Sequence, residues 1–167
     1  IYTSPHIQKI NERFIFNDEE ISDDNLSKLL IEVENVNNGE QITYFEILTA
    51  AYFYHASKFK DKINIIESGL FHRFDATNII DNNLSSIVTS IGLDHLDWLP
   101  KNEQNIEKIV YEKTSSLLNS TIVVSKQSSD ETLNLIKKTI NNNQSKKIVY
   151  KNQFNYCLLY TSPSPRD

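Results

Sequence analysis

The sequence has little of what several protein classes require. Its 167 residues contain no methionine, three glycines and one cysteine. The single cysteine, Cys157, excludes an internal disulfide framework and favours a reducing compartment, so we expect a cytoplasmic protein. No apolar run approaches the roughly 20 residues that a membrane-spanning helix needs, and no basic-then-apolar start resembles a signal peptide. We therefore expect no association with a membrane.

The charge pattern also lacks the signature of a nucleic-acid-binding protein. The formal net charge is −5, and acidic and basic residues are interspersed. A basic stripe or patch is the usual electrostatic footprint of nucleic-acid binding, so this composition argues against such a partner. A chain that has no methionine and opens on Ile1 is expected to be part of a longer protein.

Helical and strand-like periodicities alternate along the chain. Helices are expected after Ser22, from Thr43, over Asn102–Leu118, and from Ser128 to about Asn141, the last with Ser128 and Glu131 as a capping box. Strands are expected at Ile1–Thr3 (a stub), Lys62–Ile66, Ser86–Ile91, Thr121–Ser125 and Lys147–Tyr150. This alternation predicts an α/β fold with a mainly parallel sheet flanked by helices.

The ends of the regular pattern set the expected domain limits. Residues 1–156 are expected to form one domain. The tail 157–167 changes character abruptly and holds two of the four prolines, so we interpret it as a foreign or read-through end. About twenty irregular residues separate the strands Lys62–Ile66 and Ser86–Ile91, and long loops of this kind in compact domains are often functional.

Two polar clusters follow predicted strands. Glu67 comes directly after the first, with Gly69 allowing close approach of a ligand, and Asp94-His95 follows the second. Because ligands bind at the carboxyl ends of strands in α/β sheets, Glu67 and His95 are candidates to share a cation. The carboxylate suits Mg²⁺, and the imidazole also suits Mn²⁺. A solvated strand end for Glu67 and a turn cap for Asp94-His95 are the simpler alternatives.

Further candidates lie in the irregular segment and in the predicted helices. Asp75 and Asn78 either form an Asx-turn or line a pocket, in which Arg73 would face an anionic group. Glu46 closes a capping box with Thr43, although a helix N-terminus is also an anion site. Ser4 either offers a hydroxyl to a metal or shapes a turn.

Lys113 occupies an unusual position for a lysine. It lies seven, four and three residues after Ile106, Ile109 and Val110, which places it on the apolar stripe of its own helix. A lysine that extends to the rim of the stripe is the common explanation. The alternative is a desolvated amine of depressed pKa that reacts with CO₂ to form a carbamate, which is a metal ligand.

The order of these pieces is specific. Thr3-Ser4-Pro5-His6, Asn11-Glu12-Arg13, Ile21-Ser22, Thr43-Tyr44-Phe45-Glu46, Glu67-Ser68-Gly69-Leu70, Arg73-Phe74-Asp75-Ala76-Thr77-Asn78, Thr89-Ser90-Ile91-Gly92-Leu93-Asp94-His95 and Glu112-Lys113 follow one another along the chain. Over roughly residues 1–125 they resemble the folylpolyglutamate synthase/dihydrofolate synthase family of the Mur ligase superfamily. The resemblance implies part of a P-loop NTPase-like central domain.

The resemblance also implies a reaction and a set of sites. The family uses ATP to activate the carboxylate of dihydropteroate or a folate as an acyl phosphate, and the amine of L-glutamate then forms an amide. Carried over by motif, the metal ligands are Ser4, Glu67 and His95, and Lys113 is the carbamylated lysine, with His95 and Lys113 as the catalytic residues. The implied substrate contacts are Thr43, Tyr44, Phe45, Glu46, Arg73, Phe74, Asp75, Ala76 and Asn78. A cytoplasmic monomer that uses Mg²⁺, or Mn²⁺, is expected.

The sequence departs from the family pattern at several points. Phe71-His72 stands where the family usually has Gly-Gly, and Thr114-Ser115-Ser116 replaces the usual Ala-Gly-Ile after the lysine. No Gly-rich phosphate loop occurs in these residues, so we expect the 167-residue chain alone to be inactive. The alternatives are a non-catalytic relic of the domain, which Phe71-His72 favours, and a ligase of cell-wall precursors, against which the Thr43–Glu46 and Asp75-Ala76 blocks speak.

Overall fold

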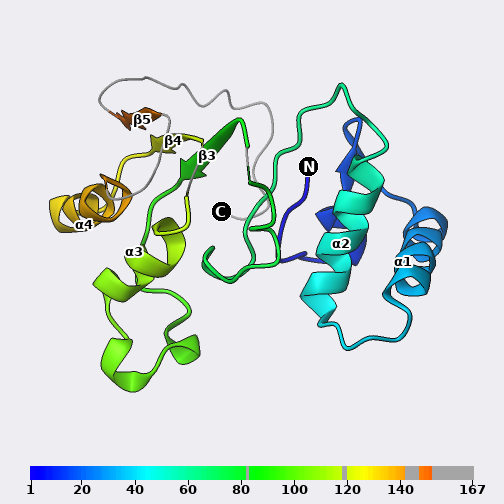
Figure 1. The fold of residues 1–167 in the computed structure, drawn as a ribbon, viewed down its shortest axis with the longest axis horizontal. Helices are drawn as coiled ribbons and strands as arrows, with labels where there is room; N and C mark the ends of the chain where they lie inside the picture. The colour runs from blue at the N-terminus through cyan, green and yellow to red at the C-terminus, as the bar shows by residue number, and fades with distance from the viewer. Residues whose placement is uncertain (82, 118–119, 142–146, 152–167) are drawn as a thin grey trace. The chain divides into compact units, whose positions relative to one another are not determined.

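The computed structural model describes residues 1–81, 83–117, 120–141 and 147–151. Within them the chain divides into two compact units, Ile1–Asp81 (unit 1) and Asn82–Asp167 (unit 2). Each unit has its own helices and its own sheet (Figure 1). The predicted tail 157–167 lies outside the described residues. The single domain expected over 1–156 remains a proposal.

Unit 1 is built around two helices. Its elements are the 3-10 helix η1 (Ile10–Arg13), the strands β1 (Ile15–Phe16) and β2 (Glu19–Glu20), and the helices α1 (Asp23–Asn37) and α2 (Tyr44–Ala56). The Ser22 hydroxyl accepts the N–H of Asn25 at the start of α1, and Thr43 caps α2, so both predicted helix starts are confirmed. The antiparallel pair β1–β2 was not expected from the sequence.

The predicted strand Lys62–Ile66 is reduced to a single bridge. Tyr2 pairs in parallel with Ile66 and antiparallel with Phe14. The Tyr2 N–H donates to the Ile65 carbonyl over 2.8 Å, and the Glu67 N–H donates to the Tyr2 carbonyl over 2.9 Å. The ladder does not extend along the chain beyond this point, because the Ser4 N–H donates to the Glu67 side chain and the Gly69 N–H to Asp75. The β-branched run is therefore extended but has too few partners to count as a strand.

Unit 2 holds a three-stranded parallel sheet in the order β3-β4-β5. Its elements are β3 (Ser85–Val88), η2 (Leu96–Trp98), η3 (Lys101–Glu103), α3 (Ile106–Thr114), β4 (Thr121–Val124), α4 (Asp130–Asn141) and β5 (Lys147–Tyr150). Helices α3 and α4 pack against each other. The predicted α/β class with a mainly parallel sheet is confirmed.

Three predicted boundaries in unit 2 need correction. Strand β3 ends at Val88, three residues before the predicted Ile91. Helix α3 begins at Ile106, because the Asn105 side chain accepts the Lys108 N–H and caps it there. The cap of α4 is Ser129 rather than Ser128, since the Ser129 hydroxyl accepts the N–H of Thr132 over 3.1 Å. In each case a local side-chain hydrogen bond or a turn sets a limit that periodicity does not resolve.

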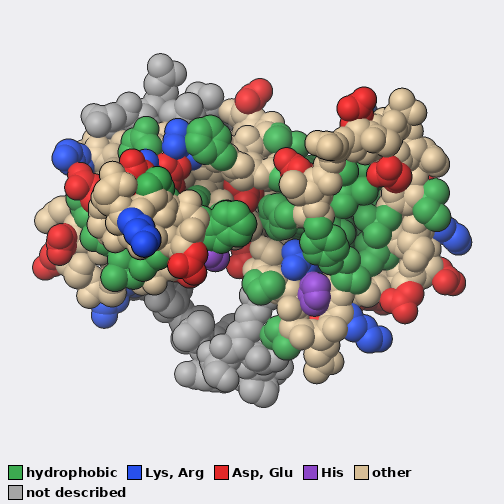
Figure 2. Space-filling view, turned by 90° about the horizontal axis from the view of Figure 1, so that it is seen from below, with side chains coloured by type: hydrophobic (Ala, Val, Ile, Leu, Met, Phe, Trp, Pro, Cys, Tyr) green, Lys and Arg blue, Asp and Glu red, His purple; other side chains and the backbone are tan. Residues whose placement is uncertain are grey.

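Each unit has its own core. In unit 1 the buried side chains are Tyr2, Phe14, Ile21, Leu26, Leu29, Val33, Leu48, Ala51 and Tyr52. In unit 2 they include Ile109, Val110, Ile122, Val124, Ile136 and Ile140. Figure 2 shows acidic and basic side chains scattered together over the face that it displays. Within the described residues, no helix combines the length and apolar content that crossing a bilayer requires.

Candidate functional site

Two of the predicted metal ligands lie side by side in unit 1. The Tyr2–Ile66 bridge brings the residues that follow each partner together. As a result the backbone N–H of Ser4 donates to Glu67 Oε2 over 2.8 Å. Ser4 is half-buried and Glu67 is exposed. Among the described residues, the other oxygen of this carboxylate, Oε1, has no hydrogen-bond partner, so it can accept a further donor or a cation.

The loop after Glu67 is organised by one buried carboxylate. Asp75 Oδ2 accepts the N–H groups of Gly69 (3.0 Å) and Leu70 (2.8 Å). Its Oδ1 accepts both the N–H of Thr77, over 2.9 Å, and the Thr77 hydroxyl. The bond to the N–H two residues later is an Asx-turn, the simpler of the two interpretations of the sequence. Asp75 therefore fixes the path of the loop, and its contact with a substrate stays a proposal.

The predicted substrate-binding blocks meet at Gly69. A Cβ on Gly69 would lie 2.3 Å from Phe45 Cζ, so only glycine fits under this ring. Phe45 belongs to the first turn of α2, which begins with the predicted capping box: the Thr43 N–H donates to Glu46 Oε2 over 2.8 Å. The Thr43 side-chain and backbone hydrogen bonds hold the pKa of Glu46 below its usual value. The start of α2 and the loop after Glu67 thus form one continuous surface.

The remaining predicted substrate residues lie on the same loop. The Arg73 guanidinium carbon is 4.0 Å from the centre of the Phe74 ring, which is 83% exposed. The Asn78 side-chain amide donates to the Arg73 carbonyl over 3.3 Å, and Ala76 is half-buried. Tyr44, at the start of α2, is 58% exposed. Two accessible aromatic rings therefore belong to the predicted substrate set.

Phe71, which precedes His72, has a backbone conformation that suits glycine better. Phe71 has φ +57°, in the left-handed region that an L side chain rarely adopts. His72 is half-buried, and burial lowers its pKa despite the opposing influence of Asp75. The backbone conformation at position 71 is thus the one expected where the family usually has glycine, and the side chain there is strained.

His95 lies in unit 2 beside Asp94. The His95 N–H donates to Asp94 Oδ1 over 2.8 Å, and Asp94 Oδ2 lies 3.2 Å from Nε2 of the imidazole. His95 precedes η2 with φ +55°. A carboxylate that holds an imidazole in place is the usual support for a metal-binding histidine. Because Ser4 and Glu67 belong to unit 1, the predicted cation shared with His95 remains a proposal.

Lys113, the predicted site of carbamylation, lies at the margin of the apolar face of α3. Lys113 is half-buried, whereas Ile109, Val110, Glu112 and Thr114 are buried. The burial of Glu112 was not expected from the sequence. Its carboxylate pairs with Lys108 Nζ at 3.3 Å. Lys108 also contacts Glu103 at 2.8 Å, and these acidic partners, Glu103 first, raise the pKa of Lys108. Carbamylation of Lys113 stays a proposal.

The donor set is the chemical test of a metal site. Within the described ranges no group of three or more His, Cys, Asp or Glu side chains is placed to hold a metal ion. The predicted set needs only two such residues, Glu67 and His95, with the Ser4 hydroxyl as the third ligand. Oxygen ligands with one imidazole suit Mg²⁺ or Mn²⁺. The residues therefore fit the expected cation by chemical type.

Glu12 is a structural residue to which the sequence interpretation gave no role. Its carboxylate accepts the N–H groups of Ile7, Gln8 and Lys9 over 2.6–2.7 Å. These bonds, with that of Ile7 contributing most, lower the pKa of Glu12. The segment that leaves Ser4 is thereby folded back onto η1. A glutamate at the third position of a short helical turn was the available signal, as in a capping box.

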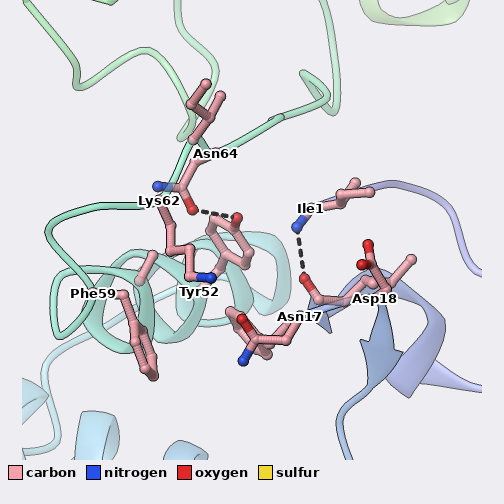
Figure 3. Close-up of a pocket in the computed structure, with 11 residues that line it drawn as sticks. Ile1, Asn17, Asp18, Tyr52, Phe59, Lys62 and Asn64 are labelled. Atoms are coloured by element: carbon pink, nitrogen blue, oxygen red, sulfur yellow. Dashed lines mark hydrogen bonds between the residues drawn. The ribbon is translucent and has the colours of Figure 1, made fainter.

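A separate cavity in unit 1 contains none of the predicted site residues. It has a volume of about 220 Å³ and is lined by residues that include Ile1, Asp18, Tyr52, Phe59, Lys62 and Asn64 (Figure 3). The Tyr52 hydroxyl donates to Asn64 Oδ1 over 2.7 Å, and burial raises the pKa of Tyr52 to about 12. With a pKa this high, the Tyr52 hydroxyl keeps its proton at neutral pH and donates it to the side-chain amide of Asn64.

Comparison with known proteins gives a consistent result. No family model matches the chain. It is 34% identical over 106 residues to the dihydrofolate synthase/folylpolyglutamate synthase of Escherichia coli, a match over 64% of this chain and 25% of the relative. It is 36% identical over 143 residues to the same enzyme of Bacillus subtilis, covering 81% of this chain and 32% of the relative. The chain thus spans about a quarter to a third of the length of these curated relatives.

A solved structure supports the same assignment. The bifunctional folylpolyglutamate synthase/dihydrofolate synthase of Yersinia pestis, complexed with AMPPNP and a Mn ion, is 29% identical and superposes with a TM-score of 0.69. The match covers 87% of this chain and 35% of that structure. Sequence relatives and fold therefore agree with the order of motifs along the chain. The chain belongs to the folylpolyglutamate synthase/dihydrofolate synthase family.

Proposed function

We propose that this chain contributes to an ATP-dependent ligase that joins the carboxylate of dihydropteroate, or of a folate, to the amine of L-glutamate. The observation that carries the proposal is the contact between Ser4 and Glu67, next to the surface formed by Phe45 and Gly69. The predicted metal ligands Ser4 and Glu67 therefore lie in the same unit as the predicted substrate-binding segments at the start of α2 and after Glu67. The relatives' names describe this reaction, and the Yersinia pestis structure contains an ATP analogue and a Mn ion.

Each group in this arrangement has a physical task. Asp75 holds the backbone of Gly69 and Leu70 in place, so that the loop presents a fixed surface beside Glu67. Tyr44 and Phe74 offer exposed rings for stacking with a planar heteroaromatic substrate. Ser4, Glu67 and His95 would hold Mg²⁺ or Mn²⁺. When bound, such a cation neutralises charge on the transferring phosphoryl group and orients the two anionic reactants.

The proposal includes the expected properties of the working protein. Mg²⁺ is the preferred cation, ATP is the co-substrate, and the protein is a cytoplasmic monomer. Lys113 acts as a carbamate that supports the metal. The 167-residue chain alone does not turn over.

A ligation assay tests the proposal. Residues 1–141 replace the matching segment of the Bacillus subtilis relative, and the hybrid is assayed with ATP, glutamate and either dihydropteroate or a reduced folate. We expect ATP-dependent amide formation that Glu67→Ala and His95→Ala each reduce about 100-fold. Glu20→Ala, at an exposed carboxylate on β2, is the control and leaves the rate unchanged.

Three results would contradict this account. Ligation by the 167-residue chain alone would refute the predicted inactivity. A folded hybrid without ATP-dependent ligation would remove the assignment of function. A hybrid that keeps full activity after both substitutions would remove the assignment of the metal ligands.

A non-catalytic chain is the second candidate, and Phe71 is the observation that favours it. A bulky side chain in a glycine-like conformation, next to the half-buried His72, stands where the family usually has two glycines. Such a chain would keep the fold and lose the cation site. Binding of Mn²⁺ near Glu67 therefore separates the two candidates.

A further inference from the structure

The turn between α1 and α2 (Figure 1) contains the only Asn-Gly pair of the sequence, Asn38-Gly39. Both residues have a left-handed backbone, with φ +56° at Asn38 and φ +77° at Gly39. Asn38 is the C-terminal cap of α1, and its N–H donates to the Glu34 carbonyl over 2.9 Å. Asparagine and glycine adopt this conformation at low cost, so the pair is well suited to ending the helix.

The same pair is chemically accessible. Asn38, Gly39 and Glu40 are exposed, and a Cβ on Gly39 would meet nothing within 4 Å. Among the described residues, no hydrogen bond engages the Asn38 side chain or the Gly39 N–H. The neighbouring Asn37 differs, because its side-chain amide donates to the Glu40 carbonyl over 2.8 Å. One asparagine of the turn is therefore held in place, and the side chain of the next one can rotate.

An accessible asparagine amide next to a glycine N–H has a definite chemistry. The Gly39 nitrogen attacks Cγ of Asn38 and gives up its proton, while the Cγ–Nδ2 bond breaks and ammonia leaves with that proton. The product is a five-membered succinimide that joins the side chain to the backbone. Water then opens the ring at one of its two carbonyls, which gives aspartate or isoaspartate. A side chain on the following residue crowds the attacking nitrogen, so glycine is the most favourable neighbour.

The fold opposes this attack only weakly. The ψ angle of Asn38 is 35°, so the backbone must rotate there before the Gly39 nitrogen can meet Cγ. The rotation leaves the bond from the Asn38 N–H to Glu34 in place, because that bond lies on the other side of Asn38. It opens the 3.2 Å bond from the Glu40 N–H to the Asn37 carbonyl and the bond from the Asn37 side chain to Glu40. Water replaces such surface hydrogen bonds at little cost.

We infer that Asn38 is a deamidation site built into the connection between α1 and α2, with water as its co-reactant. Conversion adds a carboxylate at the C-terminal end of α1, where the helix dipole disfavours negative charge. Isoaspartate also adds a methylene to the main chain, so the left-handed cap is lost. The modified chain has a frayed end of α1 and a longer connection to Thr43, which caps α2. The inference does not depend on the proposed function.

Peptide mapping tests this inference. The 167-residue chain is incubated at mildly alkaline pH, both folded and in urea, and cleavage after lysine releases residues 29–58, which contain Asn35, Asn37 and Asn38. Mass spectrometry then measures deamidation at each asparagine of this peptide. We expect reaction at Asn38 first, at a folded rate within about tenfold of the rate in urea, because only surface hydrogen bonds have to open. An isoaspartyl methyltransferase should label the product at the same position.

Three variants separate the chemistry of the pair from the geometry of the turn. Gly39→Ala should remove most of the reaction at Asn38 in both states, because a methyl group crowds the attacking nitrogen. Asn37→Ala removes the bond to Glu40 and should accelerate the folded chain about fivefold, as for the loss of one hydrogen bond, without changing the rate in urea. Asn35→Ala, at an exposed position of α1, is the matched control and leaves both rates unchanged.

Three results would overturn the inference. The first is a folded chain in which Asn38 stays intact while the sample in urea reacts. The second is a rate at Asn35 equal to that at Asn38. The third is an undiminished rate in Gly39→Ala, and the measurement in urea keeps this result decisive even where the variant does not fold.

Discussion

The two units hold their loops in different ways. In unit 1 carboxylates bind backbone N–H groups: Glu12 holds Ile7–Lys9, Glu67 holds Ser4, and Asp75 holds Gly69 and Leu70. In unit 2 a neutral amide joins the segments that follow β3 and β4. Gln127 accepts the N–H of Ile91 over 2.9 Å and donates to the carbonyls of Thr89 and Ser125.

The difference follows the architecture. Unit 2 has a parallel sheet whose strands bring Thr89 and Ser125 close, so one glutamine can join the segments that follow β3 and β4. Unit 1 has little sheet, and long irregular segments leave many N–H groups to be satisfied by side chains. Carboxylates make the stronger hydrogen bonds, and they also place negative charge where cations and polar substrates are expected to bind. The irregular unit is therefore the one that contains most of the predicted site.

Substitution of Asp75 is expected to change the stability of the protein the most. Asp75→Ala leaves the N–H groups of Gly69 and Leu70 without their acceptor and should lower the free energy of unfolding by about 3 kcal/mol. Urea denaturation measures the change, and Asp75→Asn, which keeps part of the acceptor capacity, should lose less. Equal stability of Asp75→Ala and the natural chain would show that the loop does not depend on this carboxylate.

A smaller loss of stability is expected from substitution of Gln127, the residue that holds the loops of unit 2. Gln127→Ala removes three neutral hydrogen bonds and leaves the buried Ile91 N–H unpaired, at a cost of about 2 kcal/mol. Hydrogen exchange of the Ile91 amide reports the local change. If exchange there stays as slow as in the natural chain, Gln127 is not what joins these segments.

Phe71 should show a backbone effect of about 1 kcal/mol. Phe71→Gly and Phe71→Ala both remove the ring, but only glycine adopts φ +57° without strain. The glycine variant should therefore be the more stable of the two in urea denaturation. A more stable alanine variant would mean that position 71 does not have the left-handed backbone.

The smallest effect is the dependence of stability on pH, because the Glu12 and Glu46 carboxylates lie near solvent. Their folded-state pKa values are lowered, by the Ile7 N–H for Glu12 and by Thr43 for Glu46. Their stabilisation is therefore complete above the unfolded pKa of 4.5 and is lost as the pH falls through the lower folded values. Thermal unfolding of Glu12→Gln should show a shallower decline in acid. An unchanged decline would exclude Glu12 as a contributor.

Local hydrogen bonding explains what the sequence predicted and what it did not. Ser22 and Thr43 are capping residues with unambiguous chemistry, so the starts of α1 and α2 were predictable. The bridge at Ile66 depends on which segment pairs with it, and a β-branched run does not contain that information. Ser128 and Ser129 are equally good caps by type, and only the geometry chooses between them.

The same holds for the candidate site. The motifs identified Ser4, Glu67 and Asp75, and the structure brings Ser4 to Glu67. The Asx-turn at Asp75 was one of the two interpretations of the sequence, and the bond to the Thr77 N–H bears it out. The motifs did not reveal that the other oxygen of Asp75 accepts the N–H groups of Gly69 and Leu70, because that depends on the path of the loop.

Paramagnetic broadening by Mn²⁺ tests the central claim most directly, namely that Glu67 and His95 hold one cation. Mn²⁺ is added to the 167-residue chain while the NMR signals of the Ser4 N–H and the His95 ring are followed. The account predicts that both signals broaden at the same concentration of Mn²⁺, that Glu67→Ala weakens both effects together, and that Glu20→Ala weakens neither. Broadening at His95 that is indifferent to Glu67→Ala, or no broadening at either residue, would contradict it.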